Sequence, residues 1–123
     1  MKVGDSFISN QMVTHSTTAN HLGSGDLAVF ATPSMIALME NASMMAVKQS
    51  LPKGQTTVGS AISIKHTRPT PLNATVSAKA VLKSIEGKKL TFAVNAWDSN
   101  GDIGIGEHVR YIVDIKTFMA SLT

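Results

Sequence analysis

One segment of this chain has the length and pattern of a long helix, and most of its residues are apolar. Thr32 is a favourable N-cap, and Pro33 suits the first helical position, where no backbone N–H is needed. The helix is expected to run from Pro33 to about Gln49, because the Pro and Gly of residues 51–54 (LPKG) interrupt helices. A helix without a polar face has to be covered on most sides, so the rest of the chain must wrap around it.

The remainder of the chain has the pattern of strands and turns. A first strand is expected at residues 6–13, followed by a loop rich in Ser, Thr, Asn and Gly at 14–26. Four further strands follow the helix, at residues 56–68, 74–85, 90–97 and 103–115. Asn100-Gly101 is a strong hairpin signal, and residues 86–89 (EGKK) form another turn. The four later strands are therefore expected to form an antiparallel meander.

This order of elements predicts an α+β fold with one helix layer and one sheet layer. Because a flat sheet covers only one side of the helix, we expect a curled antiparallel sheet wrapped around one long central helix, which is the hotdog architecture. The sheet would have an open edge, and pairing with a second copy would protect it, so a homodimer is expected. The 123 residues fit a single domain spanning residues 1–123.

The composition excludes several classes of protein. Hydrophobic residues make up 43% of the chain and charged residues 15%, so the chain can bury a core and is not disordered. Cys is absent, and His15 and His21 lack a third ligand at a suitable spacing, so we expect neither a metal nor a redox cofactor. The net charge of +3 is spread along the chain, which argues against nucleic acid as a partner. No segment is apolar enough to be a signal peptide or a membrane span, so a cytoplasmic location is expected.

Glu40 is the one acidic residue of the apolar helix, and it shares its face with Ile36 and Met44. An ionised carboxylate is costly to bury there unless it has a partner, a raised pKa or an opening onto a cleft. Thr32 lies eight residues earlier, about 12 Å along the helix axis, so the two side chains cannot bond to each other in one helix. If they act together, a substrate spans the gap or a second subunit supplies one of them. This separation favours a site at a dimer interface.

Side chains of the strand at residues 56–66 face the helix layer that contains Glu40. Alternation places Val58, Ser60, Ile62, Ile64 and His66 on the face that packs against the helix. Gly59 is unfavourable within a strand, so it indicates a bulge or a close approach of another group to the backbone.

Three segments of the chain closely resemble the fluoroacetyl-CoA thioesterase family of hotdog proteins: GSGDLAVFATPSMIALME, TTVGSAISIKHTRPTPLNATVSAKAVL and GEHVRYIVD. The resemblance covers residues 14–118. In that family a Thr at the helix start, a Glu on the helix and a His at the end of the next strand form the catalytic set. The resemblance implies these roles for Thr32, Glu40 and His66, and matches Gly59 to a Gly near the catalytic centre. It also implies an acyl-CoA substrate.

We therefore expect hydrolysis of a short-chain acyl-CoA. Glu40 would activate water or attack the thioester directly, and His66 would polarise the thioester or protonate the leaving thiolate. Thr32 would orient the carboxylate or the substrate, and Arg68 is a candidate to bind the CoA phosphates. The family's namesake selects its acyl group with an aromatic lid, but Phe30 is the only aromatic residue between Phe7 and Phe92, so the fluorinated acyl group is not carried over.

Other interpretations remain open from the sequence. On the same fold, the chain could be a non-catalytic acyl-CoA binding or sensing module, or a hydratase or dehydratase that uses a carboxylate and a His. Glu40 could instead be a structural acid paired with a core His or Arg. Arg110 is also left open, between pairing with Asp114 or Glu107 and serving the site.

Overall fold

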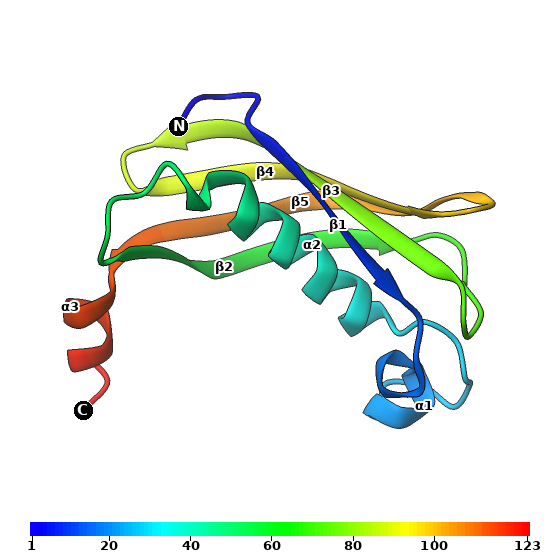
Figure 1. Cartoon of the computed structure of the whole chain (residues 1–123). Helices are drawn as coiled ribbons and strands as arrows, with labels where there is room; N and C mark the ends of the chain where they lie inside the picture. The colour runs from blue at the N-terminus through cyan, green and yellow to red at the C-terminus, as the bar shows by residue number, and fades with distance from the viewer.

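A single antiparallel sheet of five strands curls around one long helix in the computed structural model, which describes all 123 residues (Figure 1). The long helix is α2 (Thr32–Lys48), and the strands are β1 (Ser6–Met12), β2 (Gln55–His66), β3 (Thr75–Glu86), β4 (Lys89–Asp98) and β5 (Gly101–Asp114). The predicted α+β fold is confirmed. The sequence did not indicate three short helical segments, η1 (His15–Thr17), α1 (Ala19–Leu22) and α3 (Ile115–Ala120).

The strand order is β1-β3-β4-β5-β2, so the predicted four-stranded meander is wrong for β2. Only β3, β4 and β5 follow one another through tight turns, in which Gly87 (φ 63°) and Gly101 (φ 124°) adopt the left-handed backbone. Residues 67–74 contain two prolines and are too long for a tight hairpin, so this segment crosses over and β2 pairs with β5 instead. As a result β1 and β2 form the two edges of the sheet.

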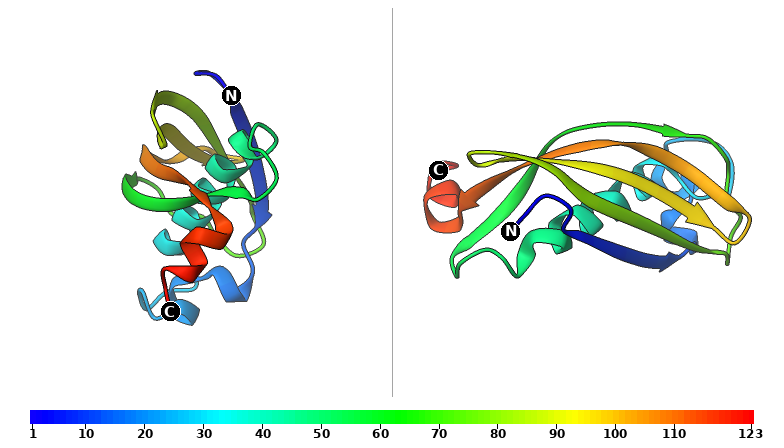
Figure 2. Two further views of the ribbon diagram at one scale, coloured as in Figure 1. Left: turned by 90° about the vertical axis from the view of Figure 1, so that its left-hand side faces the viewer. Right: turned by 90° about the horizontal axis from the view of Figure 1, so that it is seen from above.

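Three bulges bend the sheet around the helix. They lie between Gly59 and Ala61 in β2, between Leu82 and Ser84 in β3, and at Ile103 in β5, opposite Ala96 and Trp97 of β4. A bulge bends its strand and increases the local twist. Seen from one end, the sheet therefore curls from β2 to β1 with α2 lying between the two edges (Figure 2, left).

The core lies between α2 and the concave face of the sheet. The alternating side chains of β3 and β4 that point toward α2 are all buried: Val76, Ala78, Ala80, Leu82, Leu90, Phe92, Val94 and Ala96. They pack against helix residues that include Met35, Leu38 and Met39. The helix is nevertheless not covered all round, because Pro33, Ala37 and Asn41 form an exposed stripe along it.

The inward face predicted for β2 is right for its second half and wrong for its first half. The extra residue at the bulge, Ser60, reverses the alternation, so Thr57 and Gly59 face α2 in place of Val58 and Ser60. From Ile62 to His66 the alternation is the predicted one. Gly59 was expected to mark a bulge or a close approach of another group, and both are observed: the bulge directly follows Gly59, and the Glu40 carboxylate lies close to it.

In β5 the polar alternate residues face the helix, whereas Ile105 and Tyr111 on the other face are exposed. The inward set is Gly104, Gly106, His108 and Arg110, which pair with inward residues of β2 and β4. Gly104 explains this choice, because a Cβ there would lie 2.5 Å from Sδ of Met35. Close packing of the helix against glycine thus brings the polar face of β5 inward.

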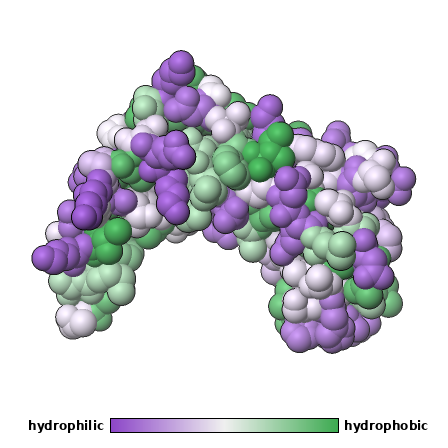
Figure 3. Space-filling model, in the orientation of Figure 1, coloured by the Kyte–Doolittle hydropathy of each residue, from purple (hydrophilic) through white to green (hydrophobic).

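The short helices α1 and α3 lie at opposite ends of the sheet, on the side of α2 (Figure 1). They give the molecule the outline of an arch, with a hollow between its two ends (Figure 3). No helix combines the length and the apolar character needed to cross a bilayer.

Candidate active site

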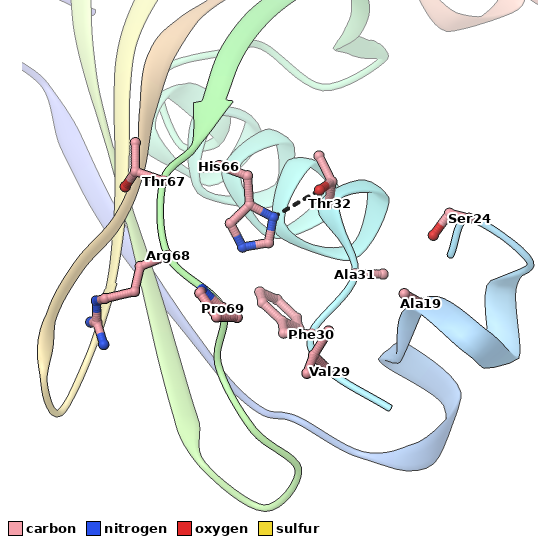
Figure 4. A pocket seen from close by; sticks show the side chains of 10 residues that line it. All are labelled: Ala19, Ser24, Val29, Phe30, Ala31, Thr32, His66, Thr67, Arg68 and Pro69. Atoms are coloured by element: carbon pink, nitrogen blue, oxygen red, sulfur yellow. Dashed lines mark hydrogen bonds between the residues drawn. The ribbon is translucent and has the colours of Figure 1, made fainter. Parts of the chain in front are cut away.

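The N-terminus of α2 meets the C-terminal end of β2, and a hydrogen bond joins them. Oγ1 of Thr32 lies 2.8 Å from Nδ1 of His66 (Figure 4). The prediction that Thr32 is the N-cap is wrong: Ala31 occupies that position and makes no side-chain cap, Thr32 is the first helical residue, and Pro33 is the second. The Thr32 hydroxyl is therefore committed to the imidazole rather than to the helix end.

The His66 ring is partly buried, which favours its uncharged form. Burial lowers the pKa of His66 below its ordinary value, while a backbone hydrogen bond with Arg68 acts in the opposite direction. Nε2 of His66 is buried and has no hydrogen-bond partner in the chain. A hydroxyl paired with a neutral imidazole is an arrangement that can pass a proton.

The Thr32–His66 pair lines a hollow of about 280 Å³. In Figure 4 the pair faces a wall formed by Phe30 and Pro69, with Val29 beneath. The hollow thus combines a hydroxyl and an imidazole with a small apolar surface. The full lining is Ala19, Ser24, Val29, Phe30, Ala31, Thr32, His66, Thr67, Arg68 and Pro69.

Arg68 lines the same hollow, but its guanidinium group points away from the Thr32–His66 pair (Figure 4). Nη2 of Arg68 lies 2.6 Å from Oδ1 of Asp98 and 2.8 Å from the carbonyl oxygen of Gly101. Thr70 donates to the second oxygen of Asp98. Burial acts to raise the pKa of Asp98, but these donors outweigh it and the pKa is lowered. These bonds of Arg68 and Thr70 connect the segment after His66 to the β4–β5 turn.

Glu40 lies on a different hollow, of about 450 Å³, which it shares with Gly59 and Arg110. Its side chain is 40% exposed, so of the three arrangements expected for this acid, the opening onto a cleft is the one observed. Oε2 of Glu40 is 2.9 Å from the point where a Cβ on Gly59 would lie. The lining of the Glu40 hollow is Ala37, Glu40, Asn41, Met44, Thr57, Val58, Gly59 and Arg110.

Two β5 side chains stand beside Glu40, and the sequence analysis missed one of them, His108. Nε2 of His108 lies 3.9 Å from Oε2 of Glu40. The partner of Arg110 was left open by the sequence, and the structure shows that it pairs with neither Asp114 nor Glu107. Its guanidinium bonds instead to Thr57 and His108. Burial lowers the pKa of Arg110, and the negative charge of Glu40 opposes that shift. One pattern in the sequence could have indicated these two residues. His108 and Arg110 alternate with Gly104 and Gly106 on one face of β5, and a strand face that carries glycines allows a helix to pack closely against it.

Within one chain the three predicted catalytic residues do not come together. Thr32 and His66 are bonded, and Glu40 lies with Gly59 on another hollow, about 12 Å further along α2. No three side chains of His, Asp or Glu gather where they could hold a metal ion.

Replacing Gly59 with Ala should displace the Glu40 carboxylate while leaving the fold intact. The backbone of Gly59 is not in the left-handed region, and the closest atom to the added methyl, at 2.9 Å, is the end of a flexible side chain. If the Glu40 carboxylate reacts, a shift of this kind should lower kcat/KM about 100-fold. The check is the thioester hydrolysis that the family resemblance implies, measured together with thermal unfolding. An activity within about twofold of wild type would show that Glu40 does not need its present position.

Comparisons with known proteins identify relatives over almost the whole chain. A family model described as fluoroacetyl-CoA-specific thioesterase matches residues 13–116. The fluoroacetyl-CoA thioesterase of Streptantibioticus cattleyicolor is 37% identical over 99% of this chain and 92% of its own. A crystal structure of the fluoroacetyl-CoA thioesterase FlK is 35% identical, with a TM-score of 0.92 over 99% of this chain and 95% of that one. A Thermus thermophilus member of the thioesterase superfamily, at 24% identity, shares the fold with a TM-score of 0.91 over 98% and 90% of the two chains.

Proposed function

Because this chain belongs to the fluoroacetyl-CoA-specific thioesterase family, it is a thioester hydrolase, and we propose that it hydrolyses a short-chain acyl-CoA to the free acid and CoA. The fold is the predicted hotdog fold. Family membership favours hydrolysis over the two alternatives, an acyl-CoA sensor and a hydratase or dehydratase. The small size of the hollow at Thr32 and His66, about 280 Å³, supports a short acyl group.

The reacting site is composite, with Glu40 from one subunit and the Thr32–His66 pair from the other. The observation that carries this is the separation of the two groups onto different hollows of one chain. β2 is an open edge of the sheet, so it can pair antiparallel with β2 of a partner subunit. In such a pair the N-terminal half of one β2, which contains Gly59, lies beside the C-terminal half of the other β2, which ends at His66. The exposed stripe of α2, with Pro33, Ala37 and Asn41, supports the same dimer, because a partner would cover it.

The chemistry follows from the groups in the two halves. Glu40 takes a proton from water, and the resulting hydroxide adds to the thioester carbonyl. The first turn of α2 has unpaired N–H groups and a partial positive charge, and together with the Thr32 hydroxyl it stabilises the oxyanion. The C–S bond then breaks, and the proton that Glu40 took from water passes by way of His66 to the CoA thiolate, so that both side chains return to their starting states. Because water is the only co-reactant and no electrons are transferred, these steps need no metal or redox cofactor.

Arg68 contributes to substrate binding mainly through its position. Arg68 is one of the residues that line the acyl hollow, and its ion pair with Asp98 fixes the segment that follows His66. A homodimer and an acyl-CoA are the only partners that this site requires.

The decisive assay is the release of free thiol from acetyl-, propionyl-, butyryl- and aryl-CoA. The proposal expects turnover of the short aliphatic thioesters, with activity decreasing as the acyl chain outgrows the hollow. Release from none of them, with CoA thioesters still bound, would favour the sensor. Addition of water to an enoyl-CoA without loss of CoA would favour the hydratase.

A further inference from the structure

His108 is a buried imidazole of β5 whose two nitrogens both have partners. Its side chain is 1% exposed and lies beside Phe92 of β4. Nδ1 is 2.8 Å from the carbonyl oxygen of Ala61, and Nε2 is 3.2 Å from Nη1 of Arg110. No step of the proposed chemistry uses this ring, although it stands 3.9 Å from the Glu40 carboxylate.

The two partners of His108 require the same protonation state. A carbonyl oxygen can only accept a hydrogen bond, so Nδ1 must carry a proton to bond Ala61. A guanidinium can only donate, so Nε2 must keep its lone pair to accept from Arg110. The ring is therefore neutral, with its proton on Nδ1. The lowered pKa of His108, caused mainly by burial and also by the charge of Arg110, agrees with this state.

Each of these bonds fixes a neighbour of Glu40. The bond to Ala61 anchors β2 at the bulge that turns Gly59 toward the Glu40 carboxylate. The guanidinium of Arg110 is held by three bonds: Nη1 donates to His108, and Nε and Nη2 donate to Thr57. Arg110 and Glu40 consequently do not form a direct ion pair, and the carboxylate of Glu40 has no hydrogen-bond partner in its own chain.

We propose that His108 is a positioning residue for Glu40: as the neutral tautomer it fixes the bulge and Arg110, and it leaves the Glu40 carboxylate unpaired toward the reacting site. This inference rests on the proposed role of Glu40. A protonated His108 would repel Arg110 and donate from Nε2 toward Glu40, which would occupy the carboxylate. The charged groups that face the ring are Glu40 from α2 and Arg110 from β5; its neighbours in β2 and β4 (Ala61 and Phe92) do not titrate.

The matched variants His108→Asn and His108→Leu test the proposal, because Asn and Leu have nearly the same shape. The Asn amide N–H can replace Nδ1–H in the bond to Ala61, whereas Leu makes no polar contact. We expect kcat of the Leu variant to fall about 100-fold with KM little changed, and that of the Asn variant to fall less than about tenfold. Equal kcat values in the two variants would overturn the proposal, since packing alone would then account for His108. Thermal unfolding of both variants checks that they are folded.

A second measurement does not depend on turnover. Nitrogen-15 NMR of the wild-type protein with labelled histidine reads which ring nitrogen of His108 is protonated. We expect a protonated Nδ1 and an unprotonated Nε2 at pH 7, persisting below the ordinary pKa of histidine. A proton on Nε2 at pH 7 would overturn the proposal. Failure of the wild type to release thiol would instead count against the proposed function, so the two ideas fail separately.

Discussion

Replacing Glu40 with Gln is expected to lower kcat for thioester hydrolysis about 1000-fold, with KM changed by less than about threefold. Gln keeps the shape of the side chain and fits the same hollow beside Gly59 and Arg110. It cannot take a proton from water, so the loss should lie in the chemical step rather than in binding. The measurement is steady-state release of CoA at saturating and limiting concentrations of the best short-chain thioester.

Two controls make the Glu40→Gln result interpretable. Glu86 is exposed at the end of β3, and Glu86→Gln removes one carboxylate without touching either hollow, so its kcat should match wild type. Thermal unfolding of Glu40→Gln shows whether loss of the negative charge near the buried Arg110 has weakened the fold. A Glu40→Gln variant that is folded and keeps more than about a tenth of wild-type kcat would mean that Glu40 is a structural acid.

The sequence predicted the elements whose pattern is local. The apolar alternation of β3 and β4 and the long helix follow from side-chain periodicity, and the Asn100-Gly101 turn follows from its backbone preference. The inward orientation of His66 was also predicted, because alternation in the second half of β2 is regular. Thr32 was misassigned as an N-cap because the same hydroxyl can serve a helix end or another side chain.

The remaining features depend on contacts between distant residues. A single extra residue at Ser60 reverses which side chains of β2 face inward, and only the pairing with β5 reveals it. The inward turn of His108 and Arg110 depends on how closely α2 packs on Gly104, which periodicity does not encode. The sequence therefore indicated Gly59 and left Arg110 open, but it did not place His108 beside Glu40.

Two inactive variants are expected to restore activity to each other when they share a dimer. In a heterodimer of Glu40→Gln and His66→Ala, one composite site receives Glu40 from one subunit and His66 from the other, and both are intact. The second site of that heterodimer lacks both groups. Because a two-fold dimer has two equivalent sites, the heterodimer should have about half the wild-type kcat per dimer.

The two chains are co-expressed with different affinity tags, and the heterodimer is isolated by two successive purifications. A heterodimer of two differently tagged Glu40→Gln chains, prepared in the same way, measures the background. The composite site predicts CoA release at about half the wild-type rate, well above either parent homodimer. A heterodimer no more active than its parent homodimers would contradict the composite site. It would mean that Glu40 of one subunit does not act together with Thr32 and His66 of the other.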